Sequence, residues 1–295
     1  MTVLTRPRPT AARTVPATMA HRRMGLVPTA LLLLGAVYCL FPVSWVLIAS
    51  TKTPAELFST TTFVPGTGLL SNLRDLSAYR HGLFWQWMWN TLLYAGGGAV
   101  LSMLVSMLTG YTLAKYRFRG REAAFTLLIG GVLVPAVVLA VPQYFLLVRA
   151  GLAGGYLSVL LPSILSPYGI YLSRVYAQAA VSDSLIEAAR LDGAGELRIM
   201  FQVAFPLMVP GMVTVFLFQF VSIWNNFLLP FIMLSDDHKF PLTVGLYSLL
   251  ESGANEPTLY NLVITGSLLS IIPLIMLFLT LQRYWRVGLS SGAVK

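Results

Sequence analysis

Six long stretches without a charged residue constrain what this chain can fold into more than any other feature. Most of them exceed the roughly 20 residues that an α-helix needs to cross the hydrocarbon core of a bilayer. Inside hydrocarbon, backbone polar groups must find partners within their own segment, so each stretch is expected to be helical. The sequence therefore predicts an all-α membrane protein with six transmembrane helices. The stretches lie at about residues 25–50, 89–114, 123–148, 156–172, 207–234 and 259–281, and the fourth and shortest is expected to extend past Arg174.

The distribution of Lys and Arg predicts the orientation. Fifteen of the 20 Lys and Arg residues lie before the first stretch, between the second and third, between the fourth and fifth, or after the sixth. Positive residues accumulate on the cytoplasmic side of membrane proteins. Both termini and residues 183–210 are therefore predicted to be cytoplasmic, and residues 51–88 and 235–258 to be extracytoplasmic loops. The net charge of +9 is mostly this asymmetry facing anionic membrane lipid, and it requires no nucleic-acid partner.

The ends of the chain differ in composition from the membrane part. Residues 1–24 are basic and rich in Pro, Thr and Ala, which predicts a disordered cytoplasmic tail. The first apolar stretch is far longer than the core of a signal peptide, so we interpret it as an uncleaved helix. Residues 25–284 form the predicted membrane domain and residues 285–295 a cytoplasmic tail. Cys39 is the only cysteine, which leaves no disulfide framework or metal cluster to expect.

The apolar stretches contain no Asp, Glu, His, Lys or Arg in their interiors. Proton- and sodium-coupled carriers usually need such groups in the membrane. None of the four lysines follows the glycine pattern of a phosphate loop. We therefore expect no enzymatic activity and no ion-coupling site in this chain. If the chain moves a solute uphill, another subunit supplies the energy.

Residues 183–210 form the longest polar interruption in the second half of the chain. Ser184 and Glu187 have the spacing of a capping box, and Gly193 supplies the left-handed residue that commonly ends a helix. A second amphipathic piece begins at Glu196. The pattern predicts two short helices, bent at Asp192–Gly193, that lie outside the membrane and serve for docking.

The same residues carry a family resemblance. Glu187-Ala188-Ala189 followed by Asp192-Gly193-Ala194, and then by two prolines, resembles the EAA loop of ATP-binding-cassette (ABC) importer permeases. The end of the chain, residues 281–295, resembles that of the carbohydrate-uptake permeases, and most closely the smaller permease subunit of the maltose-type importers. Asn90-Thr91 and Trp224-Asn225 also match. The likeness covers residues 25–295. It departs at Ser182, where the family usually has proline, which leaves the start of the docking helix less rigidly defined.

The resemblance implies a type I importer permease fold in a bacterial inner membrane. It implies four kinds of partner: a second, non-identical permease, two ATP-binding subunits that use ATP and Mg²⁺, an extracytoplasmic sugar-binding protein, and membrane lipid. No cofactor is expected on this chain itself. The residues implied to couple to the ATPase are Glu187, Ala188, Ala189, Arg190, Asp192 and Gly193 in the loop, and Gly292, Ala293, Val294 and Lys295 in the tail.

Two of these residues have alternative interpretations. Glu187 also has the position to cap its own helix, an interpretation that is compatible with docking. Arg190 lies three residues after Glu187 and either pairs with it or contacts the ATPase.

A polar face in the fifth stretch is the candidate substrate path. Gln219, Ser222 and Asn226 follow helical spacing, with Trp224 and Asn225 beside them. Uncharged amides and hydroxyls next to aromatic rings are suited to sugars, but polar side chains also join membrane helices to one another. Both interpretations stand. For the binding protein, the candidate contacts are the small and polar residues Ser252, Gly253, Ala254 and Asn255.

These features predict the permease subunit of an ATP-driven importer for a sugar or oligosaccharide. One alternative is an ion-coupled or facilitative carrier that acts alone, and another is a membrane scaffold that transports nothing. An ABC importer permease for a non-sugar solute, such as an amino acid or a phosphate ester, is also open.

Overall fold

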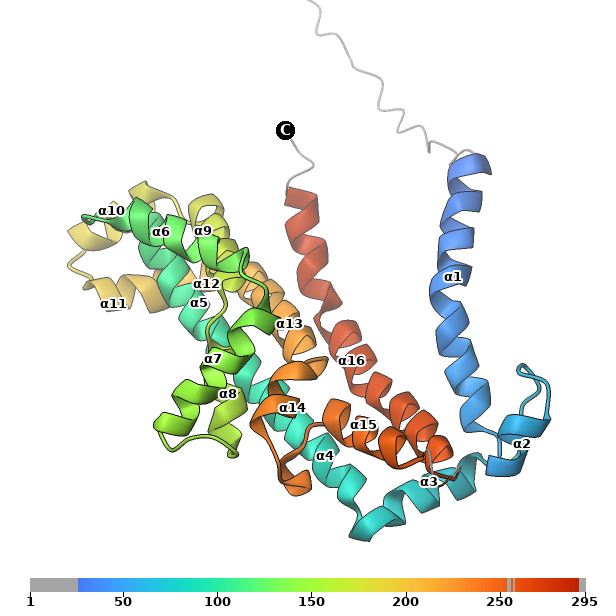
Figure 1. Ribbon diagram of the computed structural model, residues 1–295. Coiled ribbons are helices and arrows are strands. Elements are labelled where there is room, and N and C mark those ends of the chain that lie inside the picture. Colours follow the sequence, from blue (N-terminus) through green and yellow to red (C-terminus); the bar gives the residue numbers. More distant parts are fainter. Residues whose placement is uncertain (1–25, 254–255, 257, 292–295) are drawn as a thin grey trace, which may run out of the picture. The chain divides into compact units, whose positions relative to one another are not determined.

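The computed structural model describes residues 26–253, 256 and 258–291, with side chains described as far as residue 284. The predicted tail at residues 1–24, the tail residues Gly292–Lys295, and Ala254 and Asn255 lie outside the described residues. In the described part all regular structure is helical (Figure 1). The chain divides into two units, Met1–Ser44 and Trp45–Lys295. Helix α1 (Leu26–Ser50) runs across the boundary between them.

The second unit begins with short helices and one long one. Helices α2 (Pro54–Ser59) and α3 (Leu69–Ala78) precede the single-turn helix η1 (Tyr79–His81). Helix α4 (Leu83–Leu92), the π-helical segment η2 (Leu93–Gly97) and α5 (Gly98–Lys115) then form one continuous helix of 33 residues. The remaining elements are α6 (Arg121–Val132), α7 (Ala136–Arg149), α8 (Tyr156–Ile164), α9 (Pro167–Ala180), α10 (Asp183–Leu191), α11 (Glu196–Arg198), η3 (Ile199–Ala204), α12 (Phe205–Leu207), α13 (Val209–Trp224), α14 (Leu228–Met233), η4 (Asp237–Lys239), α15 (Leu242–Gly253) and α16 (Thr258–Ser291).

Three of the six apolar stretches form single long helices, and three are broken. In the described part of the chain, three helices are long and apolar enough to cross a membrane, or up to five if each sharply bent pair counts as one. Helices α6 and α7 meet at 105°. Pro135 lies at that bend and Pro167 starts α9. Proline cannot continue a helix because it lacks an N–H and its ring clashes with the preceding turn.

Helices α5 and α9 pack closely through small residues. A Cβ on Gly110 of α5 would lie 2.4 Å from Cβ of Ser173, and one on Gly169 of α9 would lie 2.6 Å from Oγ of Ser106. Ser106 and Ser173 are fully buried. Small residues let helix backbones approach closely in membranes, where packing rather than water exclusion drives association. This pair is the structural centre of the second unit.

Two apolar clusters flank this centre. One contains Phe84, Trp87, Tyr94 and Trp224 together with the start of α15. The other joins Met107 and Tyr111 of α5 to residues of the predicted docking stretch, namely Ile186, Ile199, Met200, Ala204, Phe205 and Met208. The docking stretch is therefore packed on the end of α5 by its own apolar side chains.

Residues 235–258, predicted to be an extracytoplasmic loop between two spans, are largely helical. Helix α15 occupies Leu242–Gly253 and buries Leu242, Val244 and Leu249. Gly245 lies against Trp87 of α4, since a Cβ there would be 2.2 Å from the indole ring. The apolar residues of this segment, at helical spacing, pack on α4 and α16.

Candidate functional site

The docking helix α10 begins earlier than its sequence predicts. Its N-cap is Ser182, in an extended conformation, and the Ser184 hydroxyl donates to Oγ of Ser182 at 3.2 Å. The predicted capping box of Ser184 and Glu187 is therefore wrong. Asp183 explains the difference, because its carboxylate accepts a 2.8 Å bond from Nζ of Lys115 at the end of α5. This bond lowers the pKa of Asp183, and a carboxylate in the first turn also suits the helix dipole.

The end of α10 follows the prediction. Gly193 has φ +80°, which confirms the left-handed residue. Its N–H donates to the Arg190 carbonyl and the N–H of Ala194 to the Ala189 carbonyl, both at 3.0 Å. This pair of bonds is the Schellman closure of a helix, and it fixes the direction in which the chain leaves α10.

Arg190 joins the two arms of the docking stretch. Its Nε and Nη2 donate to Oε1 and Oε2 of Glu196 at 2.7 and 3.2 Å. The Tyr116 hydroxyl donates to Oε2 of Glu196 at 2.6 Å. Hydrogen bonds from Arg190 and then from Tyr116 hold the pKa of Glu196 below its usual range. Of the two alternatives for Arg190, the pair with Glu187 is not formed, because Glu196 approaches across the Gly193 turn and binds the guanidinium.

The outer surface of the docking stretch is left open. Among the described contacts, Glu187 makes no hydrogen bond or ion pair, so it does not cap α10. Glu187, Ala188, Asp192 and Gly193 are exposed and Ala189 is half-buried. Exposed leucines accompany them, namely Leu185, Leu191 and Leu197. The stretch is thus a surface of apolar and acidic character, held through Asp183 by Lys115 at the end of α5 and through Glu196 by Tyr116, the next residue.

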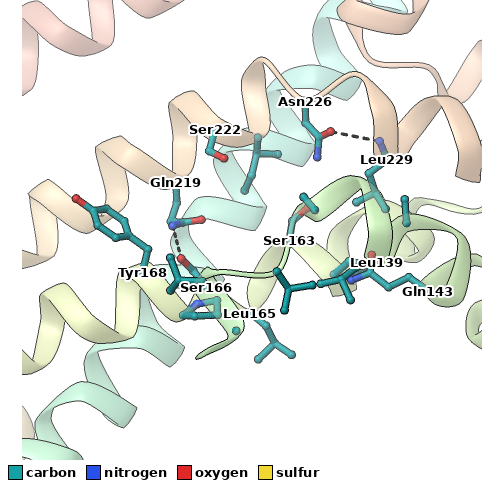
Figure 2. A pocket seen from close by; sticks show the side chains of 18 of the residues that line it. Leu139, Gln143, Ser163, Leu165, Ser166, Tyr168, Gln219, Ser222, Asn226 and Leu229 are labelled. Carbon is teal, nitrogen blue, oxygen red and sulfur yellow. Dashed lines mark hydrogen bonds between the residues drawn. The ribbon is translucent and has the colours of Figure 1, made fainter. Parts of the chain in front are cut away.

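A cavity of about 520 Å³ lies where the three broken stretches meet (Figure 2). Val134 from the first break, Ser166 from the second and Asn226 from the third all line it. Non-helical backbone at membrane depth is tolerated where it faces a cavity or protein, and broken helices are a recurrent feature of transporter binding sites. None of the described residues that line this cavity is charged. Its polar lining consists of Gln143, Ser163, Ser166, Tyr168, Gln219, Ser222 and Asn226.

Gln219 both joins helices and lines the cavity. Its Nε2 donates to Oγ of Ser166 at 2.5 Å, and Ser166 also caps α9 by accepting the N–H of Gly169 at 3.0 Å. Figure 2 shows Ser222 on the same side of α13. Asn226 lies beyond the end of α13, where its Oδ1 accepts the N–H of Leu229 at 3.3 Å.

Two of the predicted path residues lie elsewhere. Trp224 is 3% exposed and stacks on Phe220 at 5.4 Å in the apolar core. Asn225 is exposed, and its Nδ2 donates to the carbonyl of Val221 at 2.8 Å. Neither lines the cavity.

Sequence reasoning did not identify Ser163 and Ser166 as cavity residues. They lie between Pro162 and Pro167, and both prolines are visible in the sequence. Two prolines that close together predict a break in a helix. The polar residues between them were therefore detectable as candidates.

The candidate contacts for the binding protein lie at the end of α15. Ser252 is exposed and its hydroxyl donates to the carbonyl of Ser248 at 2.9 Å, while Gly253 is buried. Ala254 and Asn255 lie outside the described residues.

Comparison with known proteins gives a consistent family. The family model described as binding-protein-dependent transport system inner membrane component matches residues 81–286. The arabinooligosaccharides transport system permease protein AraQ of Halalkalibacterium halodurans is 34% identical, over 88% of this chain and 92% of that protein. The melibiose/raffinose/stachyose import permease protein MelC of Bacillus subtilis is 33% identical, over 70% and 74%. The sn-glycerol-3-phosphate transport system permease protein UgpE of Pectobacterium atrosepticum is 28% identical, over 91% and 97%.

The fold agrees with these relatives. A crystal structure of a bacterial ABC transporter involved in the import of the acidic polysaccharide alginate contains a chain similar to this one. The TM-score is 0.76 at 26% identity, covering 88% of this chain and 95% of that one. This chain belongs to the family of binding-protein-dependent transport system inner membrane components, and is a multi-pass permease subunit of an ABC importer.

Proposed function

We propose that this permease passes an uncharged sugar or oligosaccharide into the cell, through a path that includes the cavity lined by Gln219, Ser222 and Asn226. The observation that carries the proposal is the cavity itself, which combines amides and hydroxyls with apolar walls and has no charge among its described lining residues. Sugar hydroxyls pair with such groups, and the apolar ring face packs on such walls. Relatives named for arabinooligosaccharides and for melibiose, raffinose and stachyose support the substrate class.

Because some relatives are named for glycerol-3-phosphate transport, the charge of the substrate must distinguish a neutral sugar from a phosphate ester. A phosphate ester leaves water only at a high cost unless cations or donors replace its hydration. Proteins commonly bind phosphate through Arg or Lys, and neither residue is among those that line the cavity. This absence of charge from the described lining favours a neutral substrate over a phosphate ester.

The proposed assembly is a heteromer. A second, non-identical permease completes the pore, and two ATP-binding subunits that use ATP and Mg²⁺ drive it. A sugar-binding protein delivers the substrate near Ser252 and Gly253. We propose that the ATPase binds the exposed surface around Glu187 and Ala188. Asp183 and Glu196, on either side of this surface, are bonded to Lys115 and Tyr116 at the end of the continuous helix, so that movement of the ATPase would displace that helix. The tail Gly292–Lys295 is proposed as a second ATPase contact, on family resemblance alone.

The proposed topology has six spans with both termini in the cytoplasm. The spans are α1, the continuous helix α4 to α5, α6 with α7, α8 with α9, α12 to α14, and α16. Residues 1–24 and 285–295 are the proposed cytoplasmic tails. The segregation of positive residues supports this arrangement.

Substrate class is tested by uptake in the native bacterium with and without the gene. The panel is labelled arabinotriose, raffinose, lactose and sn-glycerol-3-phosphate. Deletion is expected to abolish uptake of a neutral sugar and to leave glycerol phosphate unchanged. Loss of glycerol phosphate uptake alone would contradict the neutral-substrate proposal. A mild detergent pull-down of the tagged chain tests the assembly, and recovery of the chain without an ATPase or second permease would contradict it.

The docking surface is tested by Glu187→Lys. The charge reversal is expected to lower transport at least about tenfold and to reduce retention of the ATPase in the pull-down, while the chain still inserts. The matched control is Asp75→Lys, the same change at an exposed position on α3. Wild-type transport in Glu187→Lys would remove Glu187 from the docking surface.

A further inference from the structure

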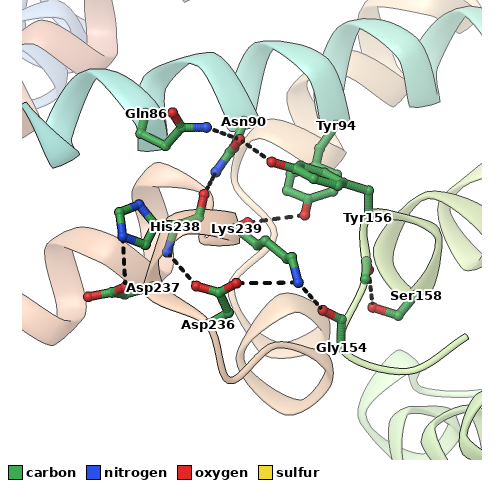
Figure 3. Close-up of polar contacts among 11 residues, drawn as sticks. Gln86, Asn90, Tyr94, Gly154, Tyr156, Ser158, Asp236, Asp237, His238 and Lys239 are labelled. Carbon is green, nitrogen blue, oxygen red and sulfur yellow. Dashed lines mark hydrogen bonds and ion pairs between the residues drawn. The ribbon is translucent and has the colours of Figure 1, made fainter.

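Asn90 and Thr91 match the family pattern, yet neither the docking surface nor the cavity uses them. Asn90 is completely buried in α4. Its Nδ2 donates to the carbonyl of His238 at 2.8 Å (Figure 3) and to that of Phe240 at 3.0 Å. Its Oδ1 accepts from Nε2 of Gln86 and from the hydroxyl of Tyr156, both at 3.2 Å. An amide has two donor hydrogens and two acceptor lone pairs, so the capacity of Asn90 is filled.

Neighbouring side chains hold the same turn. Nε1 of Trp87 donates to the carbonyl of Asp237 at 2.8 Å, and the hydroxyl of Tyr94 donates to the carbonyl of Lys239 at 3.0 Å. Trp87, Asn90 and Tyr94 follow the spacing of one helical face. Together they bind the four consecutive carbonyls of residues 237–240. The turn is therefore fixed to α4 through its backbone.

The turn leads directly into α15. The N–H of Leu242 donates to Oγ1 of Thr91 at 2.7 Å, which holds the first residue of α15 on the same helix. One turn later Gly245 packs against the indole of Trp87. Ser252 and Gly253, the proposed contacts for the binding protein, end this helix. The start of α15 is thus held on α4, while its length also packs on α16.

The opposite end of the same continuous helix carries the docking stretch. The helix runs without interruption from Leu83 to Lys115, which at about 1.5 Å per residue is about 50 Å. Lys115 holds Asp183, and Tyr116, the next residue, holds Glu196. One continuous helix, which includes the π-helical segment η2, therefore joins the segment proposed to meet the binding protein to the segment proposed to meet the ATPase.

We infer that Asn90 is a positioning residue that couples the two ends: by fixing residues 237–240 to α4, it makes docking of the binding protein act on the helix that carries the ATPase-docking stretch. The inference rests on the proposed function, because it takes the two partner surfaces from there. Asn90 touches no transported solute in this role. Its effect is on the communication between partners, so it is measured as the stimulation of ATP hydrolysis by the binding protein.

The test uses the complete importer in lipid nanodiscs, with the binding protein loaded with the sugar that wild-type cells take up. Asn90→Asp keeps the size of the side chain but replaces both N–H donors with an oxygen that faces two carbonyls. We expect the ratio of stimulated to basal ATP hydrolysis to fall about fivefold or more, with basal hydrolysis within twofold of wild type. Tyr94→Phe, which removes one hydroxyl and keeps the ring, is a milder variant and is expected to lower the ratio about twofold.

The matched control is Asn72→Asp. Asn72 is also a buried amide whose Nδ2 donates to two carbonyls, those of Ser50 and Lys52 at 2.9 and 2.8 Å, but it lies on α3 and holds a different segment. This control is expected to keep the ratio. An unchanged ratio in Asn90→Asp and Tyr94→Phe, or an equal loss in Asn72→Asp, overturns the inference. A wild-type complex that binding protein does not stimulate instead contradicts the proposed function.

Discussion

At the scale of the residue, Asn226 lies just beyond the end of α13 and is proposed to contact the sugar. Its side-chain Oδ1 accepts one hydrogen bond, of 3.3 Å from the N–H of Leu229, and the residue lines the cavity. Asn226→Ala is expected to cost little stability, because one long, weak bond is lost, and to lower sugar uptake severalfold. Uptake per assembled complex is the measurement, with Asn225→Ala beside it as a comparison outside the cavity. Loss of the complex itself in Asn226→Ala would instead assign this residue to helix packing.

Glu196, like Asp183, is a carboxylate of the docking stretch whose pKa is lowered by its hydrogen-bond partners. Its pKa is lowered in the folded protein, so its carboxylate stabilises the fold above the unfolded-state value of about 4.3. This contribution is lost only as pH falls through the lowered folded pKa. The clamp with Arg190 and Tyr116 is therefore expected to remain closed at pH 5.

The measurement is hydrogen–deuterium exchange of peptides covering residues 183–204 at pH 7 and pH 5, corrected for intrinsic exchange rates. Protection is expected to be equal at the two pH values in the wild type. Glu196→Gln is expected to speed exchange up to about fivefold at both, the effect of an exposed ion pair. Glu122→Gln, which alters an exposed ion pair on α6, serves as the control. Opening of the wild-type stretch at pH 5 would show that a group other than Glu196 controls it.

At the scale of the element, the contact between α5 and α9 leaves no room for a side chain at Gly110. A Cβ at Gly110 would lie 2.6 Å from the backbone nitrogen of Arg174, and backbone cannot move aside as a side chain can. Gly110→Ala is expected to destabilise the chain by about 1–3 kcal/mol, the usual cost of overpacking. Gly97→Ala, which meets nothing within 4 Å, is expected to leave stability unchanged or raise it. Thermal unfolding of both purified variants in one detergent checks the difference, and equal stability would mean that the helices separate freely.

The sequence predicts features that depend on neighbouring residues better than features that depend on contacts between distant residues. The helix-ending Gly193 is a local signal, and the structure follows it. The apolar runs are local signals too and are helical, but three of the six are broken. The capping box at Ser184 failed because Lys115, distant in sequence, takes Asp183. Likewise, an aromatic ring beside amides is typical of a sugar site, but Trp224 stacks on Phe220 and is buried in the core. Local patterns predict which residues are helical or polar, whereas the partner that each polar residue meets is decided by packing.

At the scale of the whole molecule, one ion pair restricts the possible topologies. Lys115 precedes α6 and Asp183 follows α9, and their side chains are 2.8 Å apart. Both residues therefore lie on one side of the membrane, so the pairs α6–α7 and α8–α9 either both cross it or neither does. By rise per residue, α6 and α7 are about 18 and 21 Å long. Neither alone spans a hydrocarbon core of about 30 Å, so a crossing needs both members of the pair.

The position of residues 150–154, which connect α7 to α8, distinguishes two crossings from none. The N–H of Gly154 donates to the carbonyl of Met233, and its own carbonyl accepts from Nζ of Lys239. Residue 239 is held near the start of the continuous helix by Tyr94, whereas Lys115 is at the end of that helix. Residues 150–154 therefore lie toward the opposite end of a helix long enough to cross the bilayer, which favours two crossings. In a Cys39→Ser background, Ala150→Cys is expected to react with an impermeant maleimide in spheroplasts, and Arg119→Cys only in inverted vesicles. Labelling of both from the same side would mean that α6–α7 and α8–α9 are re-entrant, and would reduce the proposed six spans to four.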